Sequence, residues 1–352
     1  MWQFCILIFL PIFTNYIKIN HNDFKKSKSR AITFFFILMM LLLACKAATV
    51  GNDTSNYYHM FDNACKSSWS AGIANNSEFG FFVLEKLISY VSTDSKFYMA
   101  IIAVITVIPL MLLYRNYVED APLTIVLFIN MSTFAMFFSG IRQGLCIALG
   151  AIAFYFAKNK KLIPFILLIA VAFTIHNSSF MLAFMYPLYH FKITKKWLWF
   201  VVPTIAIIFV FNKPIFNFLG TFISDYYTVS TESTGAYTMI VLFLLFATVS
   251  YLFPDDGALD KDTIALRNFL LLALVIQLFA PLNNIAMRMN YYYLIFIPLL
   301  IPKIIKCSSF KWIQLAKLAR VVMIVFFIGY FFYSLINIDS LHVYPYKFFW
   351  EG

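Results

Sequence analysis

Long apolar stretches separated by short polar segments run along almost the entire chain. A helix that crosses a bilayer needs roughly 20 mostly apolar residues, with about 17 as a practical minimum. The pattern predicts an all-α, polytopic integral membrane helix bundle with about 12 transmembrane helices, within a range of about 10–13. Paired spans such as 143–157 and 162–175 are expected to extend into their flanking residues, and a re-entrant segment is the alternative for the short apolar stretches. The predicted spans are residues 2–17, 31–47, 97–114, 122–138, 143–157, 162–175, 178–190, 197–211, 236–253, 266–281, 290–305 and 319–337.

One further apolar stretch, residues 79–94, is not expected to cross the membrane. Its sequence is FGFFVLEKLISYVSTD, with Glu85 and Lys86 in the middle. Charged side chains inside a bilayer are costly. An amphipathic or re-entrant helix on the outer face of the membrane fits this pattern better than a span.

Composition and charge agree with a membrane protein and orient it. The chain is 62% hydrophobic and 12% charged, whereas about a quarter of a soluble domain is charged. The net charge is +11, and alternate loops contain the basic segments KINHNDFKKSKSR, KNKK, KITKK and KIIKCSSFKWIQLAKLAR. By the positive-inside rule these loops are cytoplasmic, so the charge does not call for a nucleic acid partner. We predict a single membrane domain over residues 1–352, with extracytoplasmic loops at about 46–96, 212–235 and 338–352.

Basic side chains at the outer ends of spans are the first candidates for chemistry, because the orientation rule disfavours them there. Arg142, followed by Gln143, opens one span, and Arg288 lies at the outer end of another. The planar guanidinium fork of arginine suits phosphate, so these residues predict an anion site. The alternative is that both arginines reach the lipid headgroups.

An imidazole lies at the same predicted membrane level. His176 ends a span in the segment FTIHNSSFMLAF, with Asn177 and Ser178 directly behind it. A histidine titrates near neutral pH and can serve as a general base or as a hydrogen-bond donor. The alternative is a helix-end residue whose ring binds a backbone carbonyl.

The loop at 46–96 supplies acidic and aromatic candidates. Asp53 and Glu78 flank a segment rich in Asn, Ser and Tyr, which is able to hydrogen-bond sugar hydroxyls. Tyr57 is able to stack on a sugar face, although aromatic residues of an interfacial belt have the same composition. Ordinary solvated loop residues are the alternative for the two carboxylates.

No metal or cofactor is predicted. The chain has no H-E-x-x-H, P-loop or G-x-S-x-G motif, which are the patterns of metalloproteases, nucleotide-binding sites and serine hydrolases. The five cysteines lack the spacing of a metal site. The segment DDGALDKD contains a D-x-D string, which we interpret as a solvated charge cluster on a cytoplasmic loop.

Several of these segments, in their order along the chain, resemble the EpsG-like family. They are VGNDTSNY, EFGFFVLEKLISYVS, GIRQGLCIALGAIAFYFAKNKK, HNSSFMLAFMYPLY and AMRMNYYYLIFIPLL. This family consists of Wzy-type polysaccharide polymerases of bacterial envelopes. The resemblance implies a membrane glycosyltransferase that polymerises undecaprenyl-diphosphate-linked oligosaccharide repeat units for O-antigen, capsule or exopolysaccharide. It also implies a multi-pass protein of the bacterial cytoplasmic (inner) membrane whose active site faces the periplasm.

The resemblance and the candidate residues together give a set of expected roles. His176 is the expected general base, with Glu78 or Asp53 as alternatives. The residues expected to bind the diphosphate and the rest of the substrate are Arg142, Gln143, Arg288, Lys46, Tyr57, Asn177 and Ser178. Lys46 is a departure, because the basic residue that the family has a few positions before the G-x-D stretch is often an arginine. Either the lysine is an imperfect substitute or the position is dispensable. The expected partners are the lipid-linked oligosaccharide and the bilayer, with a chain-length regulator and a flippase of the same pathway as further candidates.

Three other functions stay open at this point. A glycan ligase would also use Arg and His at the outer face. A membrane acyltransferase would take its donor from the cytoplasm, whereas the histidine here is predicted to face outward. A flippase of lipid-linked units would place charges at mid-membrane in several helices, whereas here they collect at helix ends.

Overall fold

The described part of the chain is helical. The computed structural model describes residues 1–17, 24–131, 133–223, 235–255 and 257–351. Within these ranges the regular elements are helices, apart from two isolated antiparallel bridges, Lys46 with Phe348 and Pro254 with Ser308. The prediction of an all-α chain is therefore confirmed for the described residues.

The chain divides into two compact units. Unit 1 comprises Met1–Ala183 and Arg320–Gly352, and unit 2 comprises Phe184–Ala319. The assignment of the whole chain to a single membrane domain stays a prediction.

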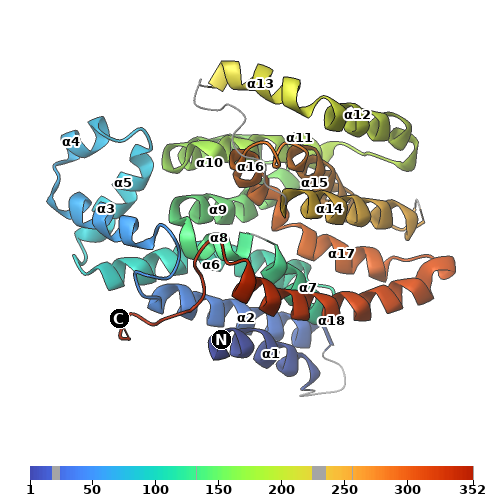
Figure 1. Ribbon diagram of the computed structural model, residues 1–352, viewed down its shortest axis with the longest axis horizontal. Helices are drawn as coiled ribbons and strands as arrows, with labels where there is room; N and C mark the ends of the chain where they lie inside the picture. The colour runs from blue at the N-terminus through green and yellow to red at the C-terminus, as the bar shows by residue number, and fades with distance from the viewer. Residues whose placement is uncertain (18–23, 132, 224–234, 256, 352) are drawn as a thin grey trace. The chain divides into compact units, whose positions relative to one another are not determined.

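Unit 1 is built on a row of packed helices. Its helices are α1 (Trp2–Tyr16), α2 (Phe24–Cys45), α3 (Thr54–Lys66), α4 (Trp69–Ala74), α5 (Phe79–Ser89), α6 (Ser95–Tyr117), α7 (Ala121–Asn130), α8 (Thr133–Ser139), α9 (Ile141–Lys158), α10 (Leu162–Ile175) and the larger part of α18 (Ile313–Asn337). In the row, α2 packs on α1 and α6, α6 packs on α9, and α9 packs on α10 (Figure 1). The short helices α3, α4 and α5 form a separate group, in which α5 contacts both α3 and α10.

Polar caps and a glycine set the helix boundaries that matter most for the site. Asp94 accepts a hydrogen bond from the Lys96 amide at the start of α6. Such side-chain caps satisfy amides that the first turn of a helix leaves without a partner. Between α8 and α9 the chain turns at Gly140, the residue that precedes α9. This break places Arg142 in the first turn of α9.

The C-terminal tail holds the connection between α2 and α3. The amide of Phe349 donates to the Cys45 carbonyl, and the amide of Gly51 donates to the His342 carbonyl. Gly51 has a positive φ of 88°, and a Cβ there would lie 2.2 Å from the Phe138 carbonyl oxygen. Only glycine permits both the turn and this close approach. The connection is therefore packed directly against the break that precedes α9.

Unit 2 is organised around one central helix. Its helices are α11 (Met185–His190), α12 (Leu198–Val210), α13 (Asn212–Ile223), α14 (Gly235–Leu252), α15 (Lys261–Gln277), α16 (Asn284–Leu294) and α17 (Ile297–Lys306). Helix α15 packs against α11, α14, α16 and α17. Part of the predicted loop 212–235 is helical as α13, and its residues 224–234 lie outside the described ranges.

Several of the described helices are suited to a bilayer. Four are long and apolar enough to cross a membrane, or up to seven if each of three bent helix pairs is one span. The four are Lys26–Cys45, Ser95–Tyr117, Ile141–Lys158 and Phe310–Asn337. The bent pairs are α7 with α8 (59°), Lys195–Val210 with Asn212–Phe218 (79°), and α16 with α17 (50°). The chain is thus a helical membrane protein, and the count of about 12 spans stays a prediction.

Two stretches differ from ordinary spans. The predicted span 178–190 is divided between a 3₁₀ helix over Asn177–Phe184 and the short helix α11. The segment 79–94, which was not expected to cross, forms α5, a helix of only 11 residues. Its placement on the outer face of the membrane stays a prediction.

Candidate functional site

One carboxylate in unit 1 accepts hydrogen bonds from three donors. Glu78 Oε2 accepts from Arg142 Nη1 at 2.5 Å. Glu78 Oε1 lies 2.9 Å from His176 Nδ1 and also accepts from the Asn177 amide at 2.9 Å. The side chains of Glu78, His176 and Arg142 are 12%, 20% and 33% exposed. The cluster is therefore largely desolvated but still reachable from outside.

Each member of this cluster lies where a helix begins or ends. Glu78 directly precedes α5, and Arg142 is the second residue of α9. His176 directly follows α10, and its amide donates to the Ala172 carbonyl while its backbone turns to an extended conformation. That turn brings the next amide, of Asn177, onto the Glu78 carboxylate. Helix ends thus supply both the charges and the backbone donor of the site.

The close approach of α5 to α10 depends on Gly80. A Cβ at Gly80 would lie 2.1 Å from Thr174 Oγ1 and 2.9 Å from the Thr174 carbonyl carbon. These distances are far below van der Waals contact, and one of the two atoms belongs to the backbone. Glycine therefore lets Glu78, two positions earlier, reach the end of α10.

We expect Gly80→Ala to separate α5 from α10 and to lower the stability of the protein. Overpacking of this kind typically costs about 1–3 kcal/mol, which thermal unfolding in detergent would detect. Gly329→Ala is the matched control, because nothing lies within 4 Å of a Cβ at that helical glycine. An unchanged melting temperature for Gly80→Ala would contradict the close packing.

Opposing effects act on the ionisation of Glu78. Burial acts to raise the pKa of its carboxyl group. The hydrogen bonds from His176 and the Asn177 amide, together with the charge of Arg142, outweigh burial and hold the pKa below its ordinary value of 4.5. Glu78 is therefore ionised at neutral pH. Because a carboxylate can only accept, His176 Nδ1 carries the proton between the two groups.

Aromatic rings hold Arg142 independently of Glu78. The guanidinium carbon lies 6.0 Å from the ring centroid of Tyr57 and 6.0 Å from that of Phe81, distances at which a cation and a ring attract. The Arg142 amide also donates to the Tyr57 hydroxyl at 3.4 Å. Among the described residues, Arg142 Nε has no hydrogen-bond partner. The guanidinium is thus fixed in place and does not use all five of its N–H donors on Glu78.

A second carboxyl group on α5 lies close to the cluster. Glu85 is 2% exposed and accepts a hydrogen bond from the Tyr98 hydroxyl at 3.1 Å. Burial raises the pKa of Glu85 to about 8, against the opposing effects of the Tyr98 hydrogen bond and the Arg142 charge. Glu85 is therefore mostly protonated at neutral pH.

The neighbouring charge on α5 has a different environment. Lys86 donates to the carbonyls of Ala64 and Cys65 at 3.0 and 3.2 Å, near the end of α3, where the helix dipole favours a cation. In the sequence, Glu85 and Lys86 indicate only that residues 79–94 do not cross the membrane. Their position in the middle of an apolar segment was the signal that they have buried partners.

Lys46 is directed toward protein oxygens. It is 1% exposed, and its ammonium group donates to Thr54 Oγ1 at 2.9 Å and to the Phe138 carbonyl. Burial lowers the pKa of Lys46 to about 7, although the charge of Asp53 opposes this. Lys46 therefore ties the α2–α3 connection to the break before α9. A direct contact of Lys46 with a diphosphate stays a prediction.

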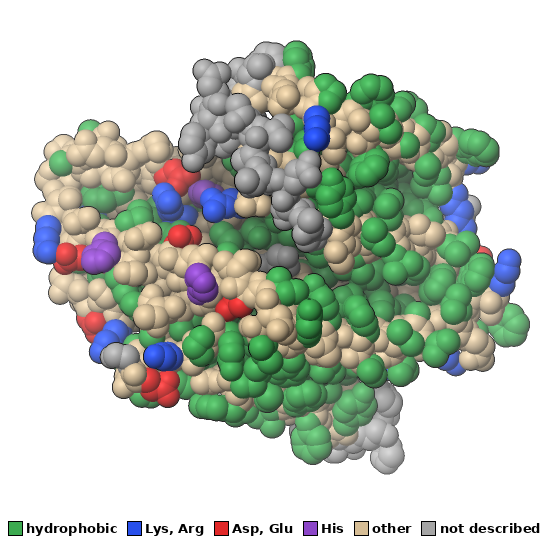
Figure 2. Space-filling model, viewed as in Figure 1, with side chains coloured by type: hydrophobic (Ala, Val, Ile, Leu, Met, Phe, Trp, Pro, Cys, Tyr) green, Lys and Arg blue, Asp and Glu red, His purple; other side chains and the backbone are tan. Residues whose placement is uncertain are grey.

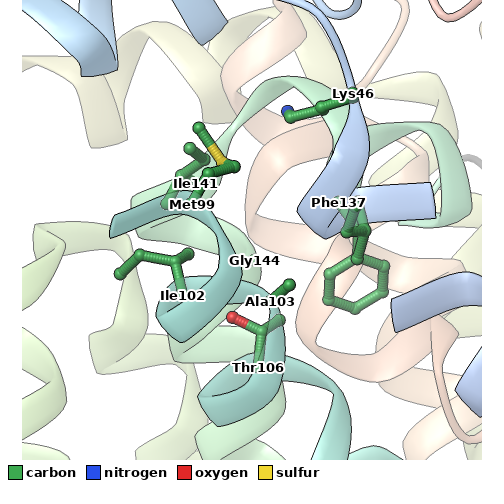
Figure 3. Close-up of a pocket in the computed structure, with 9 residues that line it drawn as sticks. Lys46, Met99, Ile102, Ala103, Thr106, Phe137, Ile141 and Gly144 are labelled. Atoms are coloured by element: carbon green, nitrogen blue, oxygen red, sulfur yellow. The ribbon is translucent and has the colours of Figure 1, made fainter. Parts of the chain in front are cut away.

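A small cavity lies beside Lys46. Figure 3 shows Lys46 at one end of it, with residues of α6 on one side and Phe137 on another. Its lining is otherwise mostly apolar and consists of Leu43, Met99, Ile102, Ala103, Thr106, Phe137, Ile141 and Gly144. The cavity shares Ile141 and Gly144 with the first turn of α9, on either side of Arg142 in the sequence.

The structure brings together part of the predicted site. Arg142, Glu78, His176, Asn177 and Tyr57 lie in one cluster. Of the other predicted residues, Gln143 is buried on α9, Ser178 is half-buried in the 3₁₀ helix, Asp53 directly precedes α3, and Arg288 is exposed on α16 of unit 2. Their roles stay predictions, as does a stacking role for Tyr57.

The charged side chains of unit 1 are unevenly distributed on the surface. In the view of Figure 2, acidic, basic and histidine side chains gather over the region of α3–α5, whereas hydrophobic side chains dominate over α1 and α18. In the described ranges, no three His, Cys, Asp or Glu side chains are grouped as a metal site. The chemistry that the described cluster supports is anion binding by a guanidinium and proton transfer by an imidazole.

Comparison with known proteins adds one match. The model of the EpsG family matches residues 30–348, which cover nearly the whole chain. No curated protein and no solved structure matches.

Proposed function

The chain belongs to the EpsG family, a Wzy-like polymerase family, and from this we propose that it polymerises undecaprenyl-diphosphate-linked oligosaccharide repeat units. Family membership supports a polysaccharide polymerase role in general. The finer proposal is carried by one observation, which is that a guanidinium and an imidazole meet on a single carboxylate at the ends of apolar helices. We place the reaction at the periplasmic face of the bacterial cytoplasmic membrane.

Arg142 is proposed to bind the diphosphate of the donor. In the transfer, a hydroxyl oxygen of the acceptor forms a bond to the anomeric carbon of the growing chain. The bond from that carbon to the phosphate oxygen breaks, and its electron pair leaves with the undecaprenyl diphosphate. The developing negative charge needs a fixed positive partner. The guanidinium, held by Tyr57 and Phe81, is suited to this task.

His176 is proposed to take the proton of the acceptor hydroxyl. Its Nδ1–H is directed at Glu78, so Nε2 is the ring nitrogen left to accept a proton. Glu78 then orients the ring and stabilises the imidazolium that forms, as a carboxylate does in a serine hydrolase triad. In this arrangement Glu78 acts through His176, and Asp53 is the more remote alternative base.

The location of the cluster fits a substrate with a lipid and a sugar part. Arg142 and His176 lie at the ends of apolar helices, one of which is a candidate span. A diphosphate at this level would keep its polyprenyl chain in the bilayer and its sugars in water. A flippase and a chain-length regulator of the same pathway remain proposed partners.

The glycan ladder of a deletion strain tests the proposal. We expect single repeat units and no long chains, with the ladder restored by the intact gene. Full-length chains that remain unattached would instead indicate a ligase, and a full ladder that lacks acetyl groups would indicate an acyltransferase. Repeat units retained on the cytoplasmic side would indicate a flippase. Long chains that persist without a second polymerase would contradict the proposal.

A further inference from the structure

The donors around Glu78 form an anion site that a side chain of the protein itself fills. Arg142, His176 and the Asn177 amide converge on this carboxylate from two helices and the turn after α10. These are the donor types that bind phosphate oxygens: a guanidinium, an imidazole N–H and a backbone amide. Glu78 and a substrate diphosphate would therefore compete for the same guanidinium.

We propose that Glu78 is a displaceable internal anion, which the diphosphate of the donor replaces at Arg142, leaving the carboxylate to His176 and the Asn177 amide. This inference rests on the function proposed above and goes further, because it couples donor binding to the activation of the base. It makes Glu78 the connection between the two halves of the reaction.

The geometry allows Arg142 to exchange its partner without moving away. The cation is held by the Tyr57 and Phe81 rings and by the backbone bond to the Tyr57 hydroxyl, so its position does not depend on Glu78. A diphosphate carries more negative charge than a carboxylate and offers a guanidinium several bidentate oxygen pairs. It is thus the stronger partner at this position.

Glu78 keeps its other two hydrogen bonds after the exchange. Its Oε1 is held by His176 and by the Asn177 amide, while only Oε2 is bound to Arg142. The diphosphate then neutralises the positive charge of Arg142, which had partly neutralised the carboxylate. The full negative charge then acts on His176 and favours the imidazolium. The base is strengthened only when a donor is bound, which discourages proton abstraction without a donor.

Glu78→Gln separates binding from turnover and so tests the exchange. The amide keeps the shape and the acceptor oxygen of the side chain but removes its charge. We expect the purified full-length variant to bind inorganic pyrophosphate about tenfold more tightly than the wild type, because its competitor for Arg142 is weakened. We expect glycan polymerisation to be about 100-fold slower, because His176 loses its anionic partner.

Two further variants keep the test decisive. Glu78→Ala removes the same charge without leaving an amide, and tighter pyrophosphate binding is expected there too. Glu85→Gln is the matched control. Glu85 lies on the neighbouring α5, is mostly protonated at neutral pH, and accepts its hydrogen bond from Tyr98. Its replacement should leave pyrophosphate affinity unchanged. Melting temperatures verify that each variant is folded.

The outcomes distinguish this inference from the proposed function. If Glu78→Gln and Glu78→Ala bind pyrophosphate no more tightly than the wild type, the exchange is wrong, even if the deletion strain lacks long chains. If the ladder persists in the deletion strain, the proposed function fails whatever the affinities show. Equal tightening by Glu85→Gln would show that the effect does not come from the charge of Glu78, and would also overturn the exchange.

Discussion

Arg142→Ala should abolish long-chain glycan in the complemented deletion strain and leave single lipid-linked repeat units. Loss of a group that stabilises developing negative charge lowers turnover by about 100- to 1,000-fold, and Arg142 is the arginine whose guanidinium bonds the Glu78 carboxylate. Arg142→Lys keeps the charge but loses the planar fork, so we expect a short, weak ladder. Gel separation of the extracted glycans measures both results.

A matched control lies between α9 and α10, at the opposite end of α9 from Arg142. Lys161 is exposed between α9 and α10 and is over the ring of Tyr155. Lys161→Ala should therefore give a normal ladder, and immunoblots of membranes show that each variant is present in equal amount. A normal ladder from Arg142→Ala would remove this residue from the mechanism and would favour headgroup contact as its role.

The individual residues of the cluster could be predicted, but their connection could not. The sequence indicates Arg142 and His176 as titratable or charged residues at the ends of apolar stretches, and Glu78 as a carboxylate beside a polar loop. Glu78 is 64 positions from Arg142 and 98 from His176. Helix patterns report local structure only, so nothing in them shows that one carboxylate joins the two. The contact depends on a packing detail, the approach of Gly80 to Thr174.

Other features escaped prediction for similar physical reasons. Hydropathy measures how apolar a stretch is but not whether it bends. It therefore predicts one span over residues 290–305, where the structure has a 50° break between α16 and α17. The burial of Lys46 depends on the turn at Gly51 and on a carbonyl 92 positions away, that of Phe138. The all-helical class could be predicted because a long apolar stretch has few other stable structures in a bilayer.

His176→Asn should stop glycosyl transfer while leaving donor binding intact. The asparagine amide can replace Nδ1–H as a donor to Glu78, but it has no ring nitrogen that accepts a proton. General base catalysis typically contributes about 100- to 10,000-fold, and we expect a loss of polymerisation within that range. Pyrophosphate affinity should stay within about twofold of the wild type, because Arg142 keeps its aromatic support. Polymerisation of purified lipid-linked units and pyrophosphate titration measure the two quantities.

A double variant shows whether Glu78 acts through His176. Because the proposed role of Glu78 in turnover requires the imidazole, His176→Asn combined with Glu78→Gln should be little slower than His176→Asn alone. His59→Asn, at an exposed position on α3, controls for the loss of a histidine as such. Additive losses in the double variant would mean that Glu78 contacts the substrate directly. A full rate for His176→Asn would transfer the role of base to Glu78 or Asp53, and the three-donor cluster would then serve anion binding alone.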